Sequence, residues 1–274
     1  MSAVLLALAS AALFGGMTVA VRLGLRGVDA GAATLATVIP AFGVSLVAAG
    51  LRHDLHGAWP FLLAGLIAPG GSQILFTLAV REVGASRTSV AVGAAPLVAV
   101  AIAIVVLGEP FRIPLIVGAL GVVGGGVLLS AERGRPEHLK AIGLAFAAGA
   151  ATMFATRDNL VRSLHAHAKP ETAAAATLLA GCVAAALWTR RAPTRRELAR
   201  LTPAGLCFGL SYVCLFEAYW RGRVSIVSPL VATESLWGVA LSAFLFRTHE
   251  QVGRRLAFGA ILVVAGGAVI GIYR

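Results

Sequence analysis

The sequence predicts an all-α integral membrane protein with ten transmembrane helices, built as two inverted repeats of five helices. Of its 274 residues, 58% are hydrophobic and only 13% are charged, whereas an average soluble domain has about 25% charged residues. The hydrophobic residues gather in long runs, and a helix of roughly 20 such residues crosses the ~30 Å hydrocarbon layer of a bilayer. The second half of the chain also repeats features of the first half, which indicates an internal duplication.

Ten apolar runs follow one another along the chain, and their connections are too short to hold a soluble domain. The first run has no basic segment before it and continues to Val21, so we expect an uncleaved first helix. The expected helices are Ala3–Val21, Ala30–Gly50, Trp59–Val80, Ser89–Leu107, Ile113–Ala131, Ala141–Leu164, Thr172–Trp188, Pro203–Trp220, Val224–Phe246 and Leu256–Tyr273.

The repeat is visible in ordered identities 140 or 141 positions apart. Ala64-Gly65-Leu66 recurs as Ala204-Gly205-Leu206, and Glu109 recurs as Glu250. We place the first repeat at 1–135 and the second at 136–274, within one membrane domain. Because each repeat has an odd number of spans, the second copy must enter the membrane from the opposite side, which is the inverted arrangement.

Small and helix-breaking residues predict how the helices pack. Gly121-x-x-x-Gly125 and Gly266-Gly267 offer small faces, so we predict that the fifth and tenth helices pair across the repeat boundary; packing within each repeat is the alternative. Prolines also interrupt the second, third, fourth and ninth helices. For Pro40 we expect a kink made for packing, whereas for Pro69-Gly70-Gly71 packing and a role near a site remain equally open.

Several function classes are disfavoured by composition. The net charge is +11, but the basic residues lie mostly between the apolar runs, as in membrane proteins, so no nucleic-acid partner is expected. Cys182, Cys207 and Cys214 fall inside apolar runs and indicate neither a disulfide nor a metal site. His165 and His167 have no acidic or cysteine cluster beside them, so we expect a solvated loop and no metal.

Glu234 is the residue around which we expect the function to be organised. It lies near the middle of Val224–Phe246, at about the bilayer midplane, where a carboxylate is costly unless it is paired, protonated or hydrated. No basic residue lies three or four positions away, so its partner must come from another helix or a cavity. Arg157 lies within about 5 Å of the same depth. We predict that the two pair directly or through a substrate; an Arg157 side chain that extends to the interface is the alternative.

The other charged residues inside the spans have acid-first partners four positions later. Asp158 with Arg162 and Glu217 with Arg221 are expected to form structural ion pairs. The first-repeat counterparts of Arg157, Asp158, Glu217 and Glu234 are uncharged, so polar recognition is expected in the second repeat. Glu109 and Glu250 are expected to cap the next helix.

Beside Glu234, Arg157 and Glu217, the candidate cavity-lining residues are Ser72, Gln73, Phe154, Tyr212, Tyr219 and Trp237.

Four stretches of this sequence resemble the drug/metabolite transporter superfamily, specifically its ten-helix EamA-type members. They are Phe14-Gly15, Pro96–Glu109 with Gly118, Glu234–Glu250, and Gly259–Gly266. The resemblance implies a ten-helix basket with a central cavity that moves small metabolites across the bacterial inner membrane. Two departures stand out. Ser235 replaces the usual proline after the ninth-helix glutamate, and the first helix has no buried acid, whereas small multidrug-resistance proteins have a glutamate there. The second departure weakens the expectation of proton-coupled export of lipophilic cations.

We therefore expect a secondary transporter that exports amino acids or similar metabolites by alternating access around a midplane cavity. A multidrug exporter of lipophilic cations is the alternative, and a membrane-embedded lipid enzyme is a remote one. No clustered acids or nucleophile–base pair are present, so we expect no enzyme activity and no catalytic residue. No cofactor is expected, while proton coupling through Glu234 and uniport both remain open. The partners are a small-molecule substrate and the lipid bilayer; a monomer would suffice and an oligomer is compatible.

Membrane orientation is unsettled by the sequence. More of the 23 Lys and Arg residues lie on the face opposite the termini, which places the termini outside by the positive-inside rule. The family resemblance implies cytoplasmic termini. A reporter fused to either terminus distinguishes the two.

Overall fold

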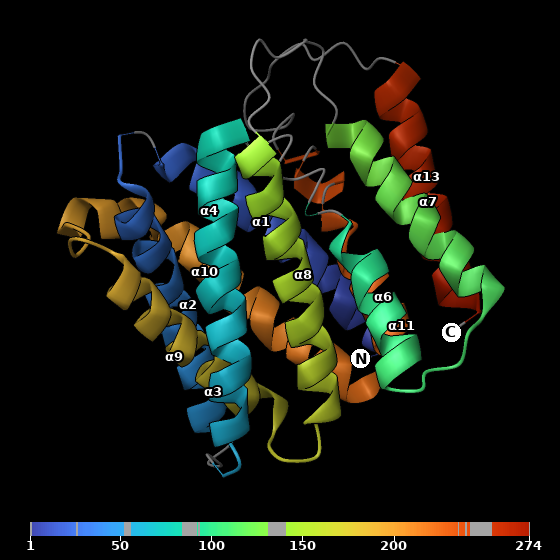
Figure 1. Cartoon of the computed structure of the whole chain (residues 1–274), viewed down its shortest axis with the longest axis horizontal. Coiled ribbons are helices and arrows are strands. Elements are labelled where there is room, and N and C mark those ends of the chain that lie inside the picture. The colour runs from blue at the N-terminus through green and yellow to red at the C-terminus, as the bar shows by residue number, and fades with distance from the viewer. Residues whose placement is uncertain are drawn as a thin grey trace.

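The computed structural model describes residues 2–25, 27–51, 56–83, 92, 94–130, 141–234, 236–238, 240–241 and 254–273 as a bundle of helices without strands (Figure 1). Their bounds follow the ten expected runs closely. The helices are α1 (Ala3–Gly24), α2 (Ala30–Leu51), α3 (Trp59–Gly65), η1 (Leu66–Gly71), α4 (Ser72–Val83), α6 (Ala95–Val106), α7 (Ile113–Ser130), α8 (Ala141–Ser163), α9 (Pro170–Trp188), α10 (Arg195–Arg221), α11 (Val224–Val231) and α13 (Arg254–Ile272).

Five described segments are long and apolar enough to cross a membrane by length and composition: α1, α2, the continuous α3–η1–α4 segment, α9 and α10. Shorter apolar helices lie at Ala95–Val106, Ile113–Leu128 and Ile261–Ile270. The predicted class, an all-helical membrane protein, is therefore confirmed.

One boundary differs clearly from the prediction. The eighth span was expected to begin at Pro203, but α10 begins at Arg195. The Thr194 hydroxyl accepts a hydrogen bond from the Glu197 backbone, and the Glu197 carboxylate accepts one from the Thr194 backbone. This capping box starts the helix early, and Arg191 holds the same carboxylate at 2.6 Å.

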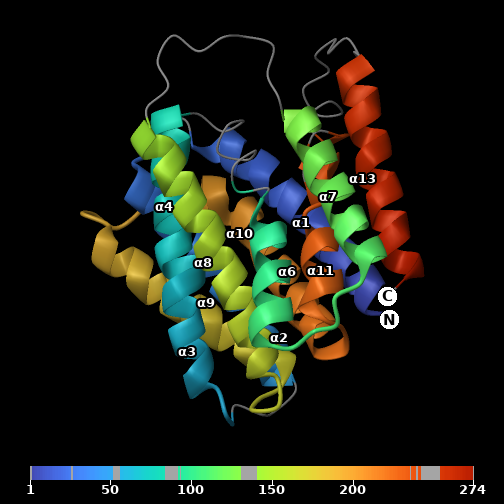
Figure 2. The ribbon, with the colours of Figure 1, turned by 45° about the vertical axis from the view of Figure 1, so that its right-hand side comes forward.

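The two halves of the chain run in opposite directions through the bundle. Both termini lie at the same end of the molecule (Figure 2). From that end α1 runs away, whereas α8, its counterpart in the second repeat, runs towards it (Figure 1). Corresponding helices are therefore inverted relative to one another.

Contacts between the repeats are also equivalent: a pair of helices in contact has a counterpart pair 140 positions away in the chain. α1 packs against α10, and its counterpart α8 packs against α4; α2 packs against α10, and α9 packs against α3 and η1. The closest approaches are equivalent as well. Gly65 lies against the Thr177 carbonyl of α9, and Gly205 lies against the Thr37 carbonyl of α2. Each glycine and its partner recur 140 positions later, so one packing solution is used twice.

The predicted pairing of the fifth and tenth helices is confirmed, because α7 and α13 pack together along one edge of the bundle (Figures 1 and 2). A Cβ atom at Gly118 would lie 2.9 Å from the Gly266 carbonyl oxygen, and one at Gly125 would lie 2.6 Å from the Gly259 carbonyl oxygen. Only glycine allows backbones to approach this closely. Gly267 does not take part; its nearest neighbour is Leu230 of α11.

The breaks in the helices are packed against their neighbours. In η1, Pro69 lies on Gly181 of α9, and Gly71 lies against Met153 of α8. In α2, Pro40 lies against Gly205. These contacts support the packing explanation for both prolines. The ninth span is different, because α11 ends at Val231 and helical backbone resumes at Glu234.

The carboxylate of Glu109 caps the beginning of α11. Its two oxygens accept hydrogen bonds from the backbone N–H groups of Val224, at 2.9 Å, and Ser225, at 3.0 Å. The prediction of a cap was right but its target was wrong, because Glu109 caps a helix of the other repeat and not the next helix along the chain. A turn at Gly108, whose φ is +66°, precedes it. Glu250 lies outside the described residues.

Adjacent glycines of α7 provide a test of the α7–α13 contact. Gly125→Ala should lower the thermal unfolding temperature in detergent, because overpacking costs about 1–3 kcal/mol. Gly124 has no atom within 4 Å of an added Cβ, so Gly124→Ala should be neutral or slightly stabilising through helix propensity. Equal effects of the two variants would contradict this packing.

Candidate functional site

Three consecutive polar residues are buried in the middle of the bundle. Arg157, Asp158 and Asn159 of α8 are 3%, 8% and 4% exposed. α8 is rich in alanine and glycine and packs against α4, α6, α10 and α11, so these side chains enter a crowded interior. Buried charges in a membrane protein need partners and commonly mark functional positions.

The guanidinium of Arg157 has two neighbours. Its Nε lies 3.1 Å from Oδ1 of Asp158, and its central carbon lies 4.9 Å from the centre of the Tyr212 ring on α10, which is a cation–π arrangement. The ion pair lacks hydrogen-bond geometry. Nε and Nη1 of Arg157 and Oδ1 of Asp158 are therefore buried without a hydrogen-bond partner among the described residues.

The predicted direct pair of Arg157 with Glu234 does not occur in this structure. Asp158 is adjacent in the chain and buried on the same side, so it reaches the guanidinium without any movement between helices. Among the described residues, no ion pair joins Arg157 to Glu234. A contact made through a substrate stays a prediction.

Asp158 contacts two other helices. Its Oδ2 accepts a hydrogen bond from the Ser228 hydroxyl of α11 at 3.4 Å. Tyr219 of α10 lies beside the same carboxylate, but its hydroxyl has no hydrogen-bond partner among the described residues. We define the polar cluster as Arg157, Asp158, Tyr212, Tyr219 and Ser228. It joins α8, α10 and α11 at one point.

The predicted Asp158–Arg162 ion pair is wrong. The Arg162 Nη1 instead donates a 2.7 Å hydrogen bond to the carbonyl oxygen of Tyr219. That carbonyl lies in the last turn of α10, where carbonyls lack helical N–H partners and a cation is favoured. The predicted Glu217–Arg221 pair is confirmed, with Oε2 and Nε 2.8 Å apart.

Sequence reasoning missed several polar residues of this interior. Asn159 donates hydrogen bonds to the Ala99 and Ala155 carbonyls at 3.0 and 2.9 Å and so ties α8 to α6. Ser225 and Ser228 are buried on α11. The usable signals were the three successive polar residues inside an apolar run, and two serines three positions apart on one helix face.

An aromatic row on α10 borders the polar cluster. Phe208, Tyr212, Phe216 and Trp220 recur every four residues, with successive ring centres 4.7, 5.7 and 6.2 Å apart. Phe14 of α1 packs against the first two rings. The Trp220 indole N–H donates to the Ala168 carbonyl at 3.1 Å, which ties the last ring of the row to the connection between α8 and α9.

The structure brings three of the nine predicted site residues into the cluster, namely Arg157, Tyr212 and Tyr219. Within the described part of the chain, no hydrogen bond or ion pair links the other six to it. Ser72 and Gln73 are buried on α4, Phe154 is half-buried on α8, Glu217 is half-buried beside Arg221, Glu234 is half-buried after the break that follows α11, and Trp237 is 41% exposed. The Glu234 backbone packs closely on Gly15 of α1.

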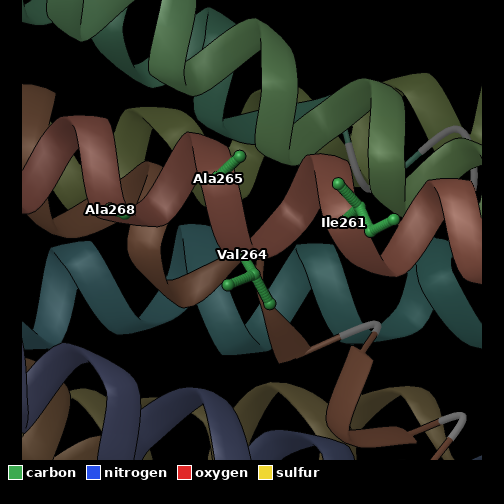
Figure 3. Close-up of a pocket in the computed structure, with 4 residues that line it drawn as sticks. All are labelled: Ile261, Val264, Ala265 and Ala268. Carbon is green, nitrogen blue, oxygen red and sulfur yellow. The ribbon is translucent and has the colours of Figure 1, made fainter.

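A shallow groove on α13 lies apart from the polar cluster. Ile261, Val264, Ala265 and Ala268 line it (Figure 3), and all four are exposed. It has almost no polar surface, so it cannot orient a polar molecule; a lipid-facing surface suits it. The described residues contain no group of three His, Cys, Asp or Glu that could hold a metal ion.

Comparison with known proteins identifies the family and the fold. The sequence model of the EamA-like transporter family matches residues 1–131 and 141–272, one match for each repeat. A solved structure described only as "Crystal structure of protein" has a TM-score of 0.86 and 20% identity, and the alignment covers 99% of both chains. At that identity it shows a shared fold. No curated protein matches the chain.

The Arg157–Asp158 pair can be tested by stability measurements. Arg157→Met should destabilise the protein by about 3–5 kcal/mol, because it leaves a buried carboxylate uncompensated. The double variant Arg157→Met with Asp158→Leu should lose much less. Tyr212→Phe removes a buried hydroxyl that has no partner and serves as the neutral control. Denaturation midpoints in detergent measure all three, and a double variant as unstable as the single one would contradict the pair.

Proposed function

The chain belongs to the EamA-like transporter family, and we propose that it is a secondary transporter that exports amino acids or similar small metabolites. Members of this family are transporters, so the chain is a multi-pass membrane transporter and not an enzyme. The direction of transport, the substrate class and placement in a bacterial inner membrane belong to the proposal.

The polar cluster is the observation that carries the substrate class. Arg157 and Asp158 place one positive and one negative group in an apolar interior, with hydrogen-bonding capacity that the protein does not use. A small molecule with both an amino group and a carboxylate complements such a site. Tyr212 and the aromatic row supply apolar contact, which small-molecule sites combine with a few polar groups.

Alternating access is supported by the architecture. The repeats run in opposite directions (Figure 1), and equivalent glycine contacts hold each to the other. In transporters of this type the site lies between the repeats, beside interrupted helices. Here α11 ends at Val231 and carries Ser228 of the polar cluster.

Glu234 is assigned to the transport path and to proton coupling. It follows the break after α11 and is half-buried, so it can meet water when the path opens. Ser72, Gln73, Phe154 and Trp237 are proposed as further lining residues. Export of lipophilic cations is the less favoured alternative, because a cation would approach the positive charge of Arg157.

Uptake by proteoliposomes tests the proposal. Vesicles containing the protein should take up amino acids from a mixed metabolite pool faster than empty vesicles, and a pH gradient should change the rate. Glu234→Gln should abolish the response to the gradient, because the amide cannot exchange a proton. Glu197→Gln, a change in a half-buried capping residue at the beginning of α10, is the matched control.

Two other outcomes would each contradict one part of the proposal. Uptake of lipophilic cations but not of amino acids would favour the drug exporter. A gradient response that persists in Glu234→Gln would remove this residue from the coupling mechanism.

A further inference from the structure

The Arg157–Asp158 pair has unused hydrogen-bonding capacity in a buried place. An arginine side chain has five N–H donors and a carboxylate has several acceptor sites. The contact between Nε and Oδ1 uses one atom of each group, at 3.1 Å and without hydrogen-bond geometry. Within the described part of the chain, Nη1 of Arg157 and the hydroxyl of Tyr212 are likewise buried without a hydrogen-bond partner.

Neighbouring groups already occupy part of each charged group. Tyr212 covers the face of the guanidinium, so a carboxylate must approach along the edge, where the N–H groups point. Ser228 bonds to Oδ2 of Asp158, which leaves Oδ1, the atom nearest Arg157, for a second ligand. The free capacity of both residues therefore faces the contact between them.

Charge balance limits what can enter this contact. The pair is neutral as a unit, and separating its members leaves two buried charges that each need a partner. A simple carboxylate would compensate Arg157 and leave Asp158 unpaired, while a simple amine would do the reverse. A zwitterion compensates both.

We propose that Arg157 and Asp158 together bind the two charged ends of a zwitterionic substrate. Arg157 takes the carboxylate and Asp158 takes the ammonium group, which inserts in place of the direct ion pair. Ser228 orients the Asp158 carboxylate through its hydrogen bond to Oδ2. This inference rests on the proposed function and makes it narrower, since it assigns the ammonium group to Asp158 and not to Glu234.

Three ligands with the same side chain test the assignment: the best-transported amino acid of the pool, its deamino acid, and its decarboxylated amine. Wild-type protein should transport the amino acid and discriminate against both analogues. Asp158→Asn should raise KM for the amino acid by about tenfold, the effect of losing one charged hydrogen bond. Asp158→Asn should either not change KM for the deamino acid or lower it, because Arg157 no longer pairs with a carboxylate of the protein. Asp158→Glu should restore part of the preference.

One further variant keeps the test decisive if Asp158→Asn does not fold. Ser228→Ala retains the carboxylate and removes the hydrogen bond to its Oδ2, so it should raise KM several-fold for the amino acid alone. Thermal stability in detergent with each of the three ligands measures binding separately from transport.

The possible failures are distinguishable. If wild-type protein neither binds nor transports any amino acid, both the proposed function and the zwitterion site are wrong. If it transports amino acids but the variants change KM equally for the amino acid and its deamino acid, the function stands and the assignment of Asp158 is wrong. The assignment of Asp158 would also be overturned if wild-type protein transported the amine or the deamino acid at the same rate as the amino acid.

Discussion

A guanidinium buried inside an apolar bundle must be compensated by neighbouring protein groups, because burial removes the charge from solvent. Arg157 is compensated by Asp158 of the same helix and by the ring of Tyr212 on α10. Asp158 in turn accepts a hydrogen bond from Ser228 on α11. Three helices are thereby held in one arrangement. Any step that exposes the guanidinium must change all of these contacts together.

The scaffold is symmetric between the repeats, while the chemistry is not. Gly65 and Gly205 make equivalent contacts with α9 and α2. The positions equivalent to Arg157 and Asp158 are Met17 and Thr18 in α1, and the Thr18 hydroxyl donates a hydrogen bond to the Phe14 carbonyl of its own helix. The duplicated frame is thus equivalent in the two repeats, while the charges at these positions lie in the second one.

Local patterns predicted the helices, and short-range rules predicted part of the packing. The apolar run at Ala30–Gly50 became α2, and the small faces around Gly121 and Gly266 correctly paired α7 with α13. The partner of Arg157 could not be derived, because depth in the membrane does not specify rotation about the helix axis. The i,i+4 rule also failed for Arg162, because it considers only side chains of one helix. The partner of Arg162 is a carbonyl at the end of another helix. Arg157, Tyr212 and Tyr219 were identified as candidates, but Ser228 and the role of Asp158 needed the fold.

The cap that Glu109 places on α11 links a connecting loop of one repeat to an interrupted helix of the other. If α11 tilts away from that loop, two backbone donors and a carboxylate lose their partners at the same moment. Glu109 is already half-exposed, whereas Val224 and Ser225 are buried, so a tilt of α11 would have to bring these two N–H groups to new partners. Because a hydrogen bond to a charged group contributes about 1.5–3 kcal/mol, a tilted α11 whose N–H groups found no water would be disfavoured by several kcal/mol.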